Sequence, residues 1–231
     1  MSTNLAQQLR EGTTKSHSMA ENVTFVKSFL GGVIDKNSYR KLVANLFFIY
    51  VAIEEEMENN KNHGAVKFIY FPELFRKNSL IEDLNYYYGT NWENQIKPSS
   101  ATQIYIDRIH NVGINQPELL IAHAYTRYIG DLSGGQILKK IAQNAMQLST
   151  NQGTAFYDFY DIQDEKLFKD MYRNSLNNIP LTSEQINQII AEANIAFNLN
   201  MKMFQELDSN LIKIMIMLLL SSINNLRKKF S

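Results

Sequence analysis

The sequence predicts an all-α protein, and three observations support this class. Apolar residues recur at helical spacing along most of the 231 residues, whereas no convincing strand alternation occurs. The chain has only four prolines, each near an expected element boundary, so long helices are permitted. Hydrophobic residues make up 45% of the chain, and no Pro-, Gly- or Ser-rich linker interrupts it. We therefore expect a single domain over residues 1–231, with its core at about residues 5–208.

The N-terminal half carries signals for several helices. A first helix begins at Leu5, and Asn37 or Ser38 is the expected N-cap of a long helix that ends near residue 59. An irregular connection follows around Gly64 and Pro72. Two further helices, each ended by a glycine, are predicted at 79–88 (Gly89) and 100–112 (Gly113).

The C-terminal half begins with Pro117, which opens a long helix at a favoured first-turn position. A shorter helix is predicted at 164–176. The run Thr182-Ser183-Glu184-Gln185 has the spacing of a capping box and starts a helix that ends near residue 207. A last helix is expected at about 210–229. Its apolar run Ile214–Leu220 is much shorter than the roughly 20 residues of a membrane span, which favours a packed or interfacial helix over a membrane anchor.

Three of the ten glycines fall inside the long helix that Pro117 opens, at Gly130, Gly134 and Gly135. Each costs about 1 kcal/mol relative to alanine, so together they weaken the helix by roughly 3 kcal/mol. Such a cost is expected where a helix must kink or lie close against something large and flat. Asp131 lies among these glycines as a candidate buried carboxylate. The spacing alone equally allows a close helix–helix contact with Asp131 in an ordinary salt bridge.

The composition excludes several functional classes. The 23 basic residues balance the 23 acidic ones, which argues against non-specific binding to nucleic acid. The absence of cysteine excludes disulfides, thiol nucleophiles, iron–sulfur clusters and thiolate-ligated iron. The N-terminus is polar and moves directly into a helical pattern, so no targeting segment is expected.

His17 is the best candidate for a single metal ligand, because no two histidines have the spacing of a zinc or di-iron site. Arg10 and Glu21 fall near the same helical face, and Glu21 could accept a hydrogen bond from the imidazole nitrogen that does not face the metal. A lone helical histidine is otherwise most often a surface or core residue. We expect His63 to be exposed, and His110 and His123 to be structural.

Two further patterns are open to alternative interpretations. Lys169 and Arg173 are four residues apart on one face, with Tyr172 beside them, and form either a solvated basic stripe or a carboxylate-binding edge. An aromatic stripe in the last long helix is either core packing or the wall of a pocket, and it consists of Phe197, Asn200 and Phe204.

Several runs of the chain resemble the haem oxygenase family. AHAYTRYIGDLSGGQILKKIAQ, residues 122–143, is similar to the distal helix of that family, and KSHSMAEN, residues 15–22, is similar to its proximal helix. The resemblance extends over roughly residues 5–208. It also includes the following segments: 49–56, 70–72, 168–173 and 196–200. The resemblance implies one helical domain that binds haem b between the proximal helix and the glycine-kinked distal helix.

The resemblance also implies roles for individual residues. His17 is the expected axial ligand of the haem iron, and Asp131 is expected to hold ordered water beside bound dioxygen, with Tyr50 and Arg127 in the same network. Further residues are expected to contact the haem, and these are Arg10, Glu21, Tyr125, Thr126, Gly130, Ser133, Gly134, Lys169, Tyr172, Arg173, Phe197, Asn200 and Phe204. Arg10 stands where other members use lysine, which preserves the charge. Residues 154–161 align only loosely, so no role is assigned to them.

The implied reaction opens the haem ring with dioxygen and releases biliverdin, carbon monoxide and ferrous iron. By resemblance to photosynthetic members we expect the IX-alpha isomer, ferredoxin as the electron donor, phycobilin synthesis as the destination, and a bilin reductase as a possible downstream partner. Acidic ferredoxin would dock on basic residues near the haem edge. The candidates are Lys15, Lys139, Lys140, Lys169 and Arg173. Abundant Asn, Ile, Lys and Tyr indicate AT-rich codons, so we expect a soluble protein of the plastid stroma or bacterial cytoplasm.

Two competing functions remain from the sequence. A non-catalytic haem carrier or sensor on the same fold would keep His17 and the basic residues but would not need Asp131. A thiamin-degrading enzyme of similar helical topology is disfavoured, because that chemistry usually relies on a cysteine nucleophile and this chain has none.

Overall fold

The computed structural model describes residues 4–148 and 152–229, with side chains described through residue 207. All regular elements within these ranges are helical, which confirms the predicted class. The α-helices are α1 (Leu5–Gly12), α2 (Thr14–Glu21), α3 (Thr24–Leu30), α4 (Lys36–Asn59), α5 (Lys77–Tyr88), α6 (Ser100–Asn115), α7 (Leu120–Ala124), α8 (Gly130–Met146), α9 (Glu165–Asn177) and α10 (Ser183–Lys229). Short 3-10 turns lie at Val66–Phe68, Pro72–Leu74, Trp92–Asn94, Pro117–Leu119 and Ala155–Tyr157.

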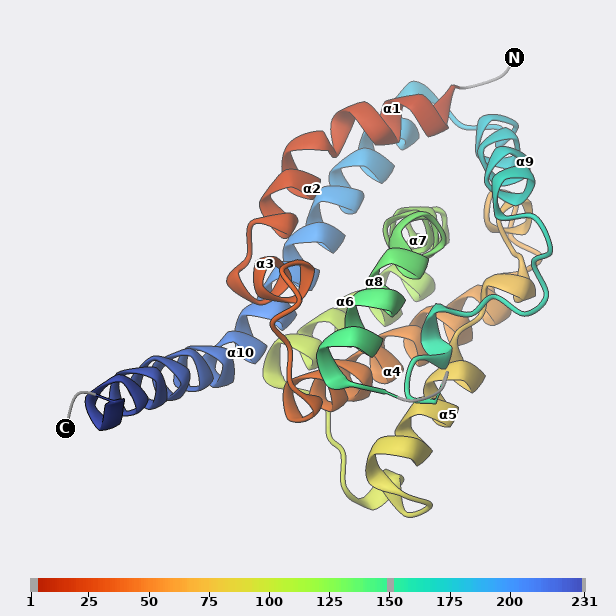
Figure 1. Cartoon of the computed structure of the whole chain (residues 1–231). Coiled ribbons are helices and arrows are strands. Elements are labelled where there is room, and N and C mark those ends of the chain that lie inside the picture. The colour runs from red at the N-terminus through yellow and green to blue at the C-terminus, as the bar shows by residue number, and fades with distance from the viewer. Residues whose placement is uncertain (1–3, 149–151, 230–231) are drawn as a thin grey trace.

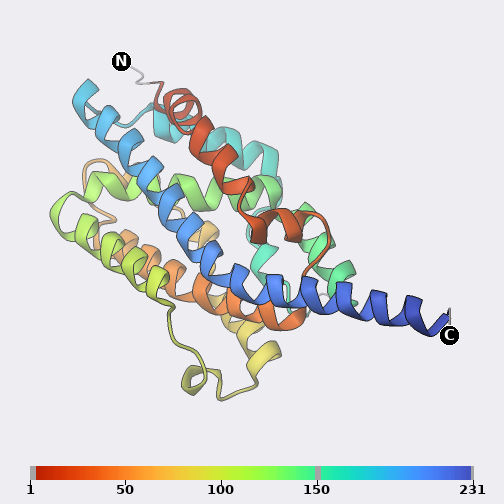
Figure 2. The same cartoon turned by 90° about the vertical axis from the view of Figure 1, so that its left-hand side faces the viewer.

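Helix α4 lies at the centre of the molecule, between α5 and α6 (Figure 1). Its side chains Ile49, Tyr50 and Ile53 are fully buried. Helix α10 crosses the molecule and contacts α6, α7, α2 and α3, and its last turns extend beyond the other helices (Figure 2). The burial of apolar side chains along these contacts supplies the main driving force for this arrangement.

Two helix ends follow the expected chemistry, and one N-cap differs. The Thr182 hydroxyl accepts from the Gln185 amide at 3.2 Å while the Gln185 side chain accepts from the Thr182 amide at 3.0 Å, as in a capping box. Gly89, with φ of 77°, follows the end of α5. The N-cap of α4 is Asp35 rather than Asn37 or Ser38, because the Asp35 carboxylate accepts from both of those backbone amides.

Two predicted helix ends were wrong. Helix α6 continues through Gly113 to Asn115. A side chain at Gly113 would overlap the carboxylate of Glu56, so this glycine permits close packing of α6 on α4. Helix α10 is one element to Lys229 rather than two helices separated near residue 208. The apolar run Ile214–Leu220 lies in the part of α10 whose side chains are outside the described residues.

The helix that Pro117 was expected to open is divided into short pieces. A 3-10 turn and α7 are followed by a π-helical segment, Tyr125–Ile129, and only then by α8. The irregular backbone therefore lies just before Gly130 and not at the glycines themselves. Such single-turn π segments are frequent at functional sites. Among the described helices, none is both long and apolar enough to cross a membrane.

Candidate functional site

Tyr50 on α4, Arg127 in the π-helical segment and Asp131 on α8 form one hydrogen-bonded group. The Tyr50 hydroxyl donates to the Asp131 carboxylate, and the Arg127 Nε donates to the Tyr50 oxygen at 3.0 Å. Another nitrogen of the same guanidinium, Arg127 Nη2, lies 3.5 Å from Asp131 Oδ1. Tyr50 is fully buried and Arg127 is nearly so. The structure thus brings together the three residues that the sequence predicted as catalytic.

Burial alters the acid–base properties of this group. Desolvation raises the pKa of Asp131 well above its ordinary value, and desolvation lowers the pKa of Arg127. A carboxyl group with a raised pKa keeps its proton at a pH where a surface aspartate has lost it. Asp131 is therefore suited to hold a proton and release it to an acceptor on the open side of α8.

Asn200 extends this network further into the core. Its side-chain oxygen accepts from Arg127 Nη1 at 2.9 Å, and its amide nitrogen donates to the Tyr105 hydroxyl at 3.2 Å. Asn200 is 3% exposed. The sequence placed this residue in a pocket wall, whereas in the structure it holds the Arg127 guanidinium in position. Tyr105 was not predicted, because its distance from Asn200 along the chain leaves no local pattern.

The face of α8 that carries Gly130 and Gly134 borders open space. A Cβ atom built on either glycine would meet no heavy atom within 4 Å, whereas a Cβ on Gly135 would lie 3.4 Å from the Tyr157 ring. The neighbouring Thr126 hydroxyl is buried and has no hydrogen-bond partner among the described residues. Ser133 is exposed. Gly130 and Gly134 therefore provide room for a ligand, while Gly135 permits packing on the opposite side.

His17 lies on α2, a helix without a single buried residue. Its imidazole Nδ1 is 3.6 Å from the Glu21 carboxylate, and its ring meets Phe197 of α10 edge-on at 5.8 Å. Phe204, which belongs to the same predicted stripe of α10 as Phe197, stacks on the Phe25 ring with 5.9 Å between the ring centres. A short helix that buries none of its own residues gains little from packing, so a ligand covering one face of α2 would stabilise it.

Arg10 and Arg173 lie on α1 and α9 and line one cleft of about 550 Å³. Arg10 belongs to α1 rather than to the helix of His17, because the chain breaks at Thr13. Burial raises the pKa of Tyr125, and the charges of Arg10 and Arg173 oppose this shift, so the tyrosine lies within reach of both cations. The structure thus gathers two of the predicted carboxylate-binding residues at one edge.

The remaining predicted residues of this edge differ from one another. Lys169 is half-buried, and Arg173 donates to Asp170 at 2.7 Å. Tyr172 is fully buried with its ring against Phe71 at 5.7 Å, and its hydroxyl has no partner among the described residues. Tyr172 is therefore a core residue behind the edge rather than an exposed contact.

One predicted docking residue was wrong. Lys139 is 8% exposed, and its amine donates to both carboxylate oxygens of Asp158 at 2.7 Å. Lys139 therefore does not contribute to an exposed basic surface, whereas Lys15 and Lys140 are exposed.

The other histidines have partners within the core or the loops. His110 Nδ1 lies 2.7 Å from Glu56, and the buried His123 Nε2 lies 3.0 Å from Glu192. His63, half-buried rather than exposed, accepts from the Ala65 amide at 3.3 Å. These contacts agree with structural roles for His110 and His123.

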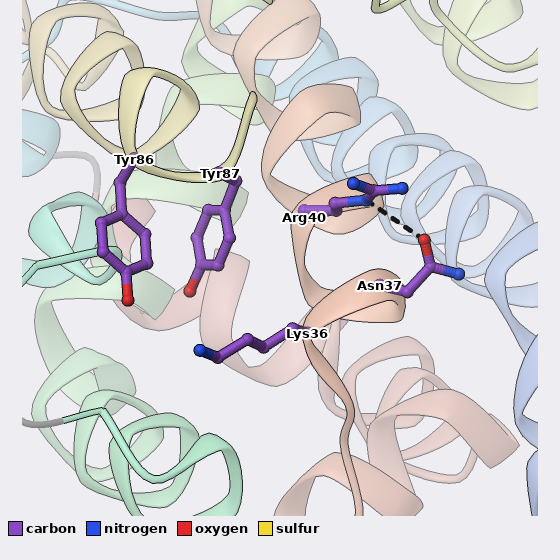
Figure 3. A pocket seen from close by; sticks show the side chains of 5 residues that line it. All are labelled: Lys36, Asn37, Arg40, Tyr86 and Tyr87. Carbon is purple, nitrogen blue, oxygen red and sulfur yellow. Dashed lines mark hydrogen bonds between the residues drawn. The ribbon is translucent and has the colours of Figure 1, made fainter. Parts of the chain in front are cut away.

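A separate cleft lies between the start of α4 and the end of α5 (Figure 3). Its side chains are Lys36, Asn37, Arg40, Tyr86 and Tyr87, and Arg40 bonds only to Asn37 in this view. None of the residues predicted for the site lines this cleft, so we do not include it in the candidate site.

The comparisons with known proteins identify the class and then the family. The fold and the site define an all-helical protein with a buried acid network beside unobstructed glycines. Residues 3–206 match the family model described as Heme oxygenase. The chain belongs to the haem oxygenase family. It is 64% identical over 229 residues to the heme oxygenase of Porphyra purpurea, which covers 99% of this chain and 97% of the relative.

Solved structures of relatives share the fold. The crystal structure of heme oxygenase-1 from the cyanobacterium Synechocystis, in complex with heme, matches with a TM-score of 0.92 and 60% identity, covering 95% of this chain and 99% of that chain. Heme oxygenase-2 from Synechocystis, in complex with heme and NO, matches with a TM-score of 0.90 and 46% identity, covering 93% of this chain and 88% of that chain. These comparisons support haem oxygenase activity for the chain.

Proposed function

We propose that this chain binds haem between α2 and α8 and opens its ring with dioxygen, releasing biliverdin, carbon monoxide and ferrous iron. The observation that carries the proposal is the buried Asp131 carboxyl group, bonded to Tyr50 and placed beside the open glycine face of α8. Haem is both substrate and cofactor, and when bound it supplies the iron that activates dioxygen and the macrocycle that is cleaved.

The residues present fit this group. His17 offers an exposed imidazole for the iron, with Glu21 close enough to orient it. Arg10, Arg173 and Lys169, together with Tyr125, supply donors for the two haem carboxylates at one edge. Three observations indicate room for a large flat ligand: the open space at Gly130 and Gly134, the unpartnered Thr126 hydroxyl, and the absence of buried residues on α2.

The protein's own contribution to the chemistry is to hold and deliver a proton. The Arg127 Nε donates to the Tyr50 oxygen, and the Tyr50 hydroxyl donates to Asp131, so both partners fix the orientation of the carboxyl group. Burial raises the pKa of Asp131, which favours the protonated form of its carboxyl group. A water molecule bound to the Asp131 carboxyl group would carry a proton toward Gly130 and Gly134, beside which an added Cβ would meet no heavy atom.

The finer assignments rest on the family and the relatives. We propose biliverdin IX-alpha as the product, ferredoxin as the electron donor, and phycobilin synthesis with a bilin reductase as the destination, because relatives come from algae and cyanobacteria. The docking surface would include Lys15, Lys140, Lys169 and Arg173. Lys139 is not part of it, because its amine is bonded to Asp158. The corresponding location is the plastid stroma or the bacterial cytoplasm.

A haem carrier or sensor is the second candidate, and the buried network argues against it. A carrier needs the imidazole and the basic edge, but it gains nothing from a protonated carboxyl group fixed by two partners. Burying such a polar group costs free energy, and this cost is expected where the group serves a reaction.

The test is an absorption time course of the purified protein with one equivalent of haemin, reductant and air, with catalase present to remove free hydrogen peroxide. Loss of the Soret band with growth of a biliverdin spectrum supports the proposal. A stable haem complex that only cycles between oxidation states would instead establish the carrier or sensor. Replacing the chemical reductant by reduced ferredoxin, at low and high salt, tests the docking surface, because electrostatic association weakens with ionic strength.

A further inference from the structure

The segment Thr154–Phe159, here called the backing segment, runs along α8 on the side away from the open glycines. The side-chain amide of Gln136 donates to the Tyr157 carbonyl at 3.0 Å, and the Lys139 amine donates to both Asp158 carboxylate oxygens at 2.7 Å. A helix turns about 100° per residue, so Gln136 and Lys139 point roughly half a turn away from Gly130 and Gly134. The backing segment therefore binds the face of α8 opposite the proposed haem site.

The backing segment is itself fixed to the core. The fully buried Asp83 carboxylate of α5 accepts from the Ala155 amide at 2.8 Å and from the Phe156 amide at 2.9 Å. The Arg76 guanidinium donates to the Asp158 carbonyl and lies 3.8 Å from the Phe159 ring centre. These anchors involve α5 and the residue preceding it, so they hold the backing segment in addition to its contacts with α8.

The backing segment also touches the acid network. The Phe156 ring meets the Tyr50 ring edge-on at 5.4 Å, on the tyrosine that donates to Asp131. One element therefore contacts both the helix that carries Asp131 and the side chain that orients it. A shift of α8 relative to the backing segment would change the Tyr50–Asp131 contact.

The Lys139–Asp158 ion pair links the two elements directly. Both amine–carboxylate contacts are short, and the two side chains are only 10% and 16% exposed. An ion pair shielded from water to this extent is screened less by salt than a surface pair, and it is more costly to break.

We propose that Lys139 and Asp158 are positioning residues that set how closely α8 approaches bound haem. By fixing the outer face of the helix, the pair determines where Gly130, Gly134 and Asp131 lie, and thereby both the rate of ring opening and the meso carbon that is attacked. This inference rests on the proposed function, in which α8 covers haem. The residues act through α8 and do not touch the substrate.

The experiment compares Asp158→Asn and Lys139→Met with the control Lys97→Met, which changes an exposed lysine outside α8 and the backing segment. Amide hydrogen exchange of Gly130–Met146 is measured in the haem-free protein, and biliverdin isomers are separated after single turnover. We expect exchange about tenfold faster in the two test variants, a turnover rate about three- to tenfold lower, and minor isomers beside the main one. The swapped variant Lys139→Asp with Asp158→Lys should restore most of both readouts, and Lys97→Met should match the wild type.

Unchanged exchange and an unchanged isomer pattern in both single variants would overturn the inference. The same changes in Lys97→Met would also overturn it, because the effect would not be specific to the pair. If a single variant does not fold, Lys139→Arg, which preserves the charge, must keep the wild-type exchange rates and isomer pattern for the inference to stand. Failure of the wild type to open haem would reject the proposed function, whereas wild-type turnover with unaltered variants would reject the positioning role alone.

Discussion

Replacing Asp131 by alanine is expected to abolish most ring opening while leaving haem bound. A positioned general acid contributes about 10²- to 10⁴-fold to a rate. The lower end applies here, because Arg127 keeps its bonds to Tyr50 and Asn200 in the variant and a water molecule can occupy the vacated volume. We therefore expect a loss of about 100-fold in single-turnover rate, equivalent to roughly 2.7 kcal/mol of barrier. Haem affinity should change less than about threefold, because His17 and the basic edge are untouched.

The assay is a stopped-flow absorption measurement of biliverdin formation at saturating reductant, with haem affinity measured separately by Soret titration. Asp131→Asn retains an acceptor for the Tyr50 hydroxyl but cannot hold a carboxyl proton, so it should lose as much as the alanine variant. Asp107→Ala, which removes an exposed carboxylate on α6, is the control. A biliverdin rate within about threefold of wild type in the alanine variant would refute the proton-holding role of Asp131. Wild-type activity in the asparagine variant alone would show that hydrogen-bond acceptance suffices.

Three further predictions concern the ligand, the glycine face and the core. His17→Ala should remove the neutral-imidazole signature of the haem complex, and an unchanged iron–histidine band in resonance Raman spectra would show that another residue is the ligand. Gly134→Leu should raise the thermal stability of the haem-free protein, since removing a helical glycine gains about 1 kcal/mol. The same variant should weaken haem binding at least tenfold, because the leucine side chain enters the open space. Retained affinity in a Soret titration would contradict haem binding on this face. Burial raises the pKa of Asp83 to about 7 from its ordinary value of 3.8, so the folded state retains a proton that the unfolded state loses, and stability falls as pH rises between these values. Between pH 5.5 and 8 this group should cost about 2 kcal/mol, so urea unfolding should show a smaller fall for Asp83→Asn than for wild type, and equal falls would disprove the assignment.

The sequence could predict those parts of the site that depend on local spacing. Arg127 and Asp131 are four residues apart, and the structure places Arg127 Nη2 3.5 Å from the carboxylate. The sequence predicted a close approach of α8 to a flat ligand, and at Gly130 and Gly134 an added Cβ would meet no heavy atom within 4 Å. Tyr50 lies 81 residues from Asp131, so the family resemblance rather than any spacing identified it.

The errors share a physical cause, which is the dominance of distant contacts over local signals. Glycine commonly ends a helix, but Gly113 lies inside α6 and permits this helix to pack on Glu56. Lys139 has the pattern of a solvated lysine, and only the fold brings Asp158 beside it. Asp35, Asn37 and Ser38 are all good N-caps, and nothing in the local sequence decides which of the three begins α4.

The two faces of α8 explain why the segment behind it is so heavily bonded. Glycines at positions 130 and 134 leave room on one face but destabilise the helix by roughly 2 kcal/mol, and the π-helical segment before them adds an irregular junction. Without other contacts, a helix weakened in this way could shift relative to α4, and Asp131 would lose its alignment with Tyr50. Contacts on the opposite face offset this cost without occupying the site, because Gln136 and Lys139 bond to the backing segment and Asp83 holds that segment to α5. The open face and the fixed face are therefore two requirements of the same function, and a change in either should alter the reaction before it unfolds the protein.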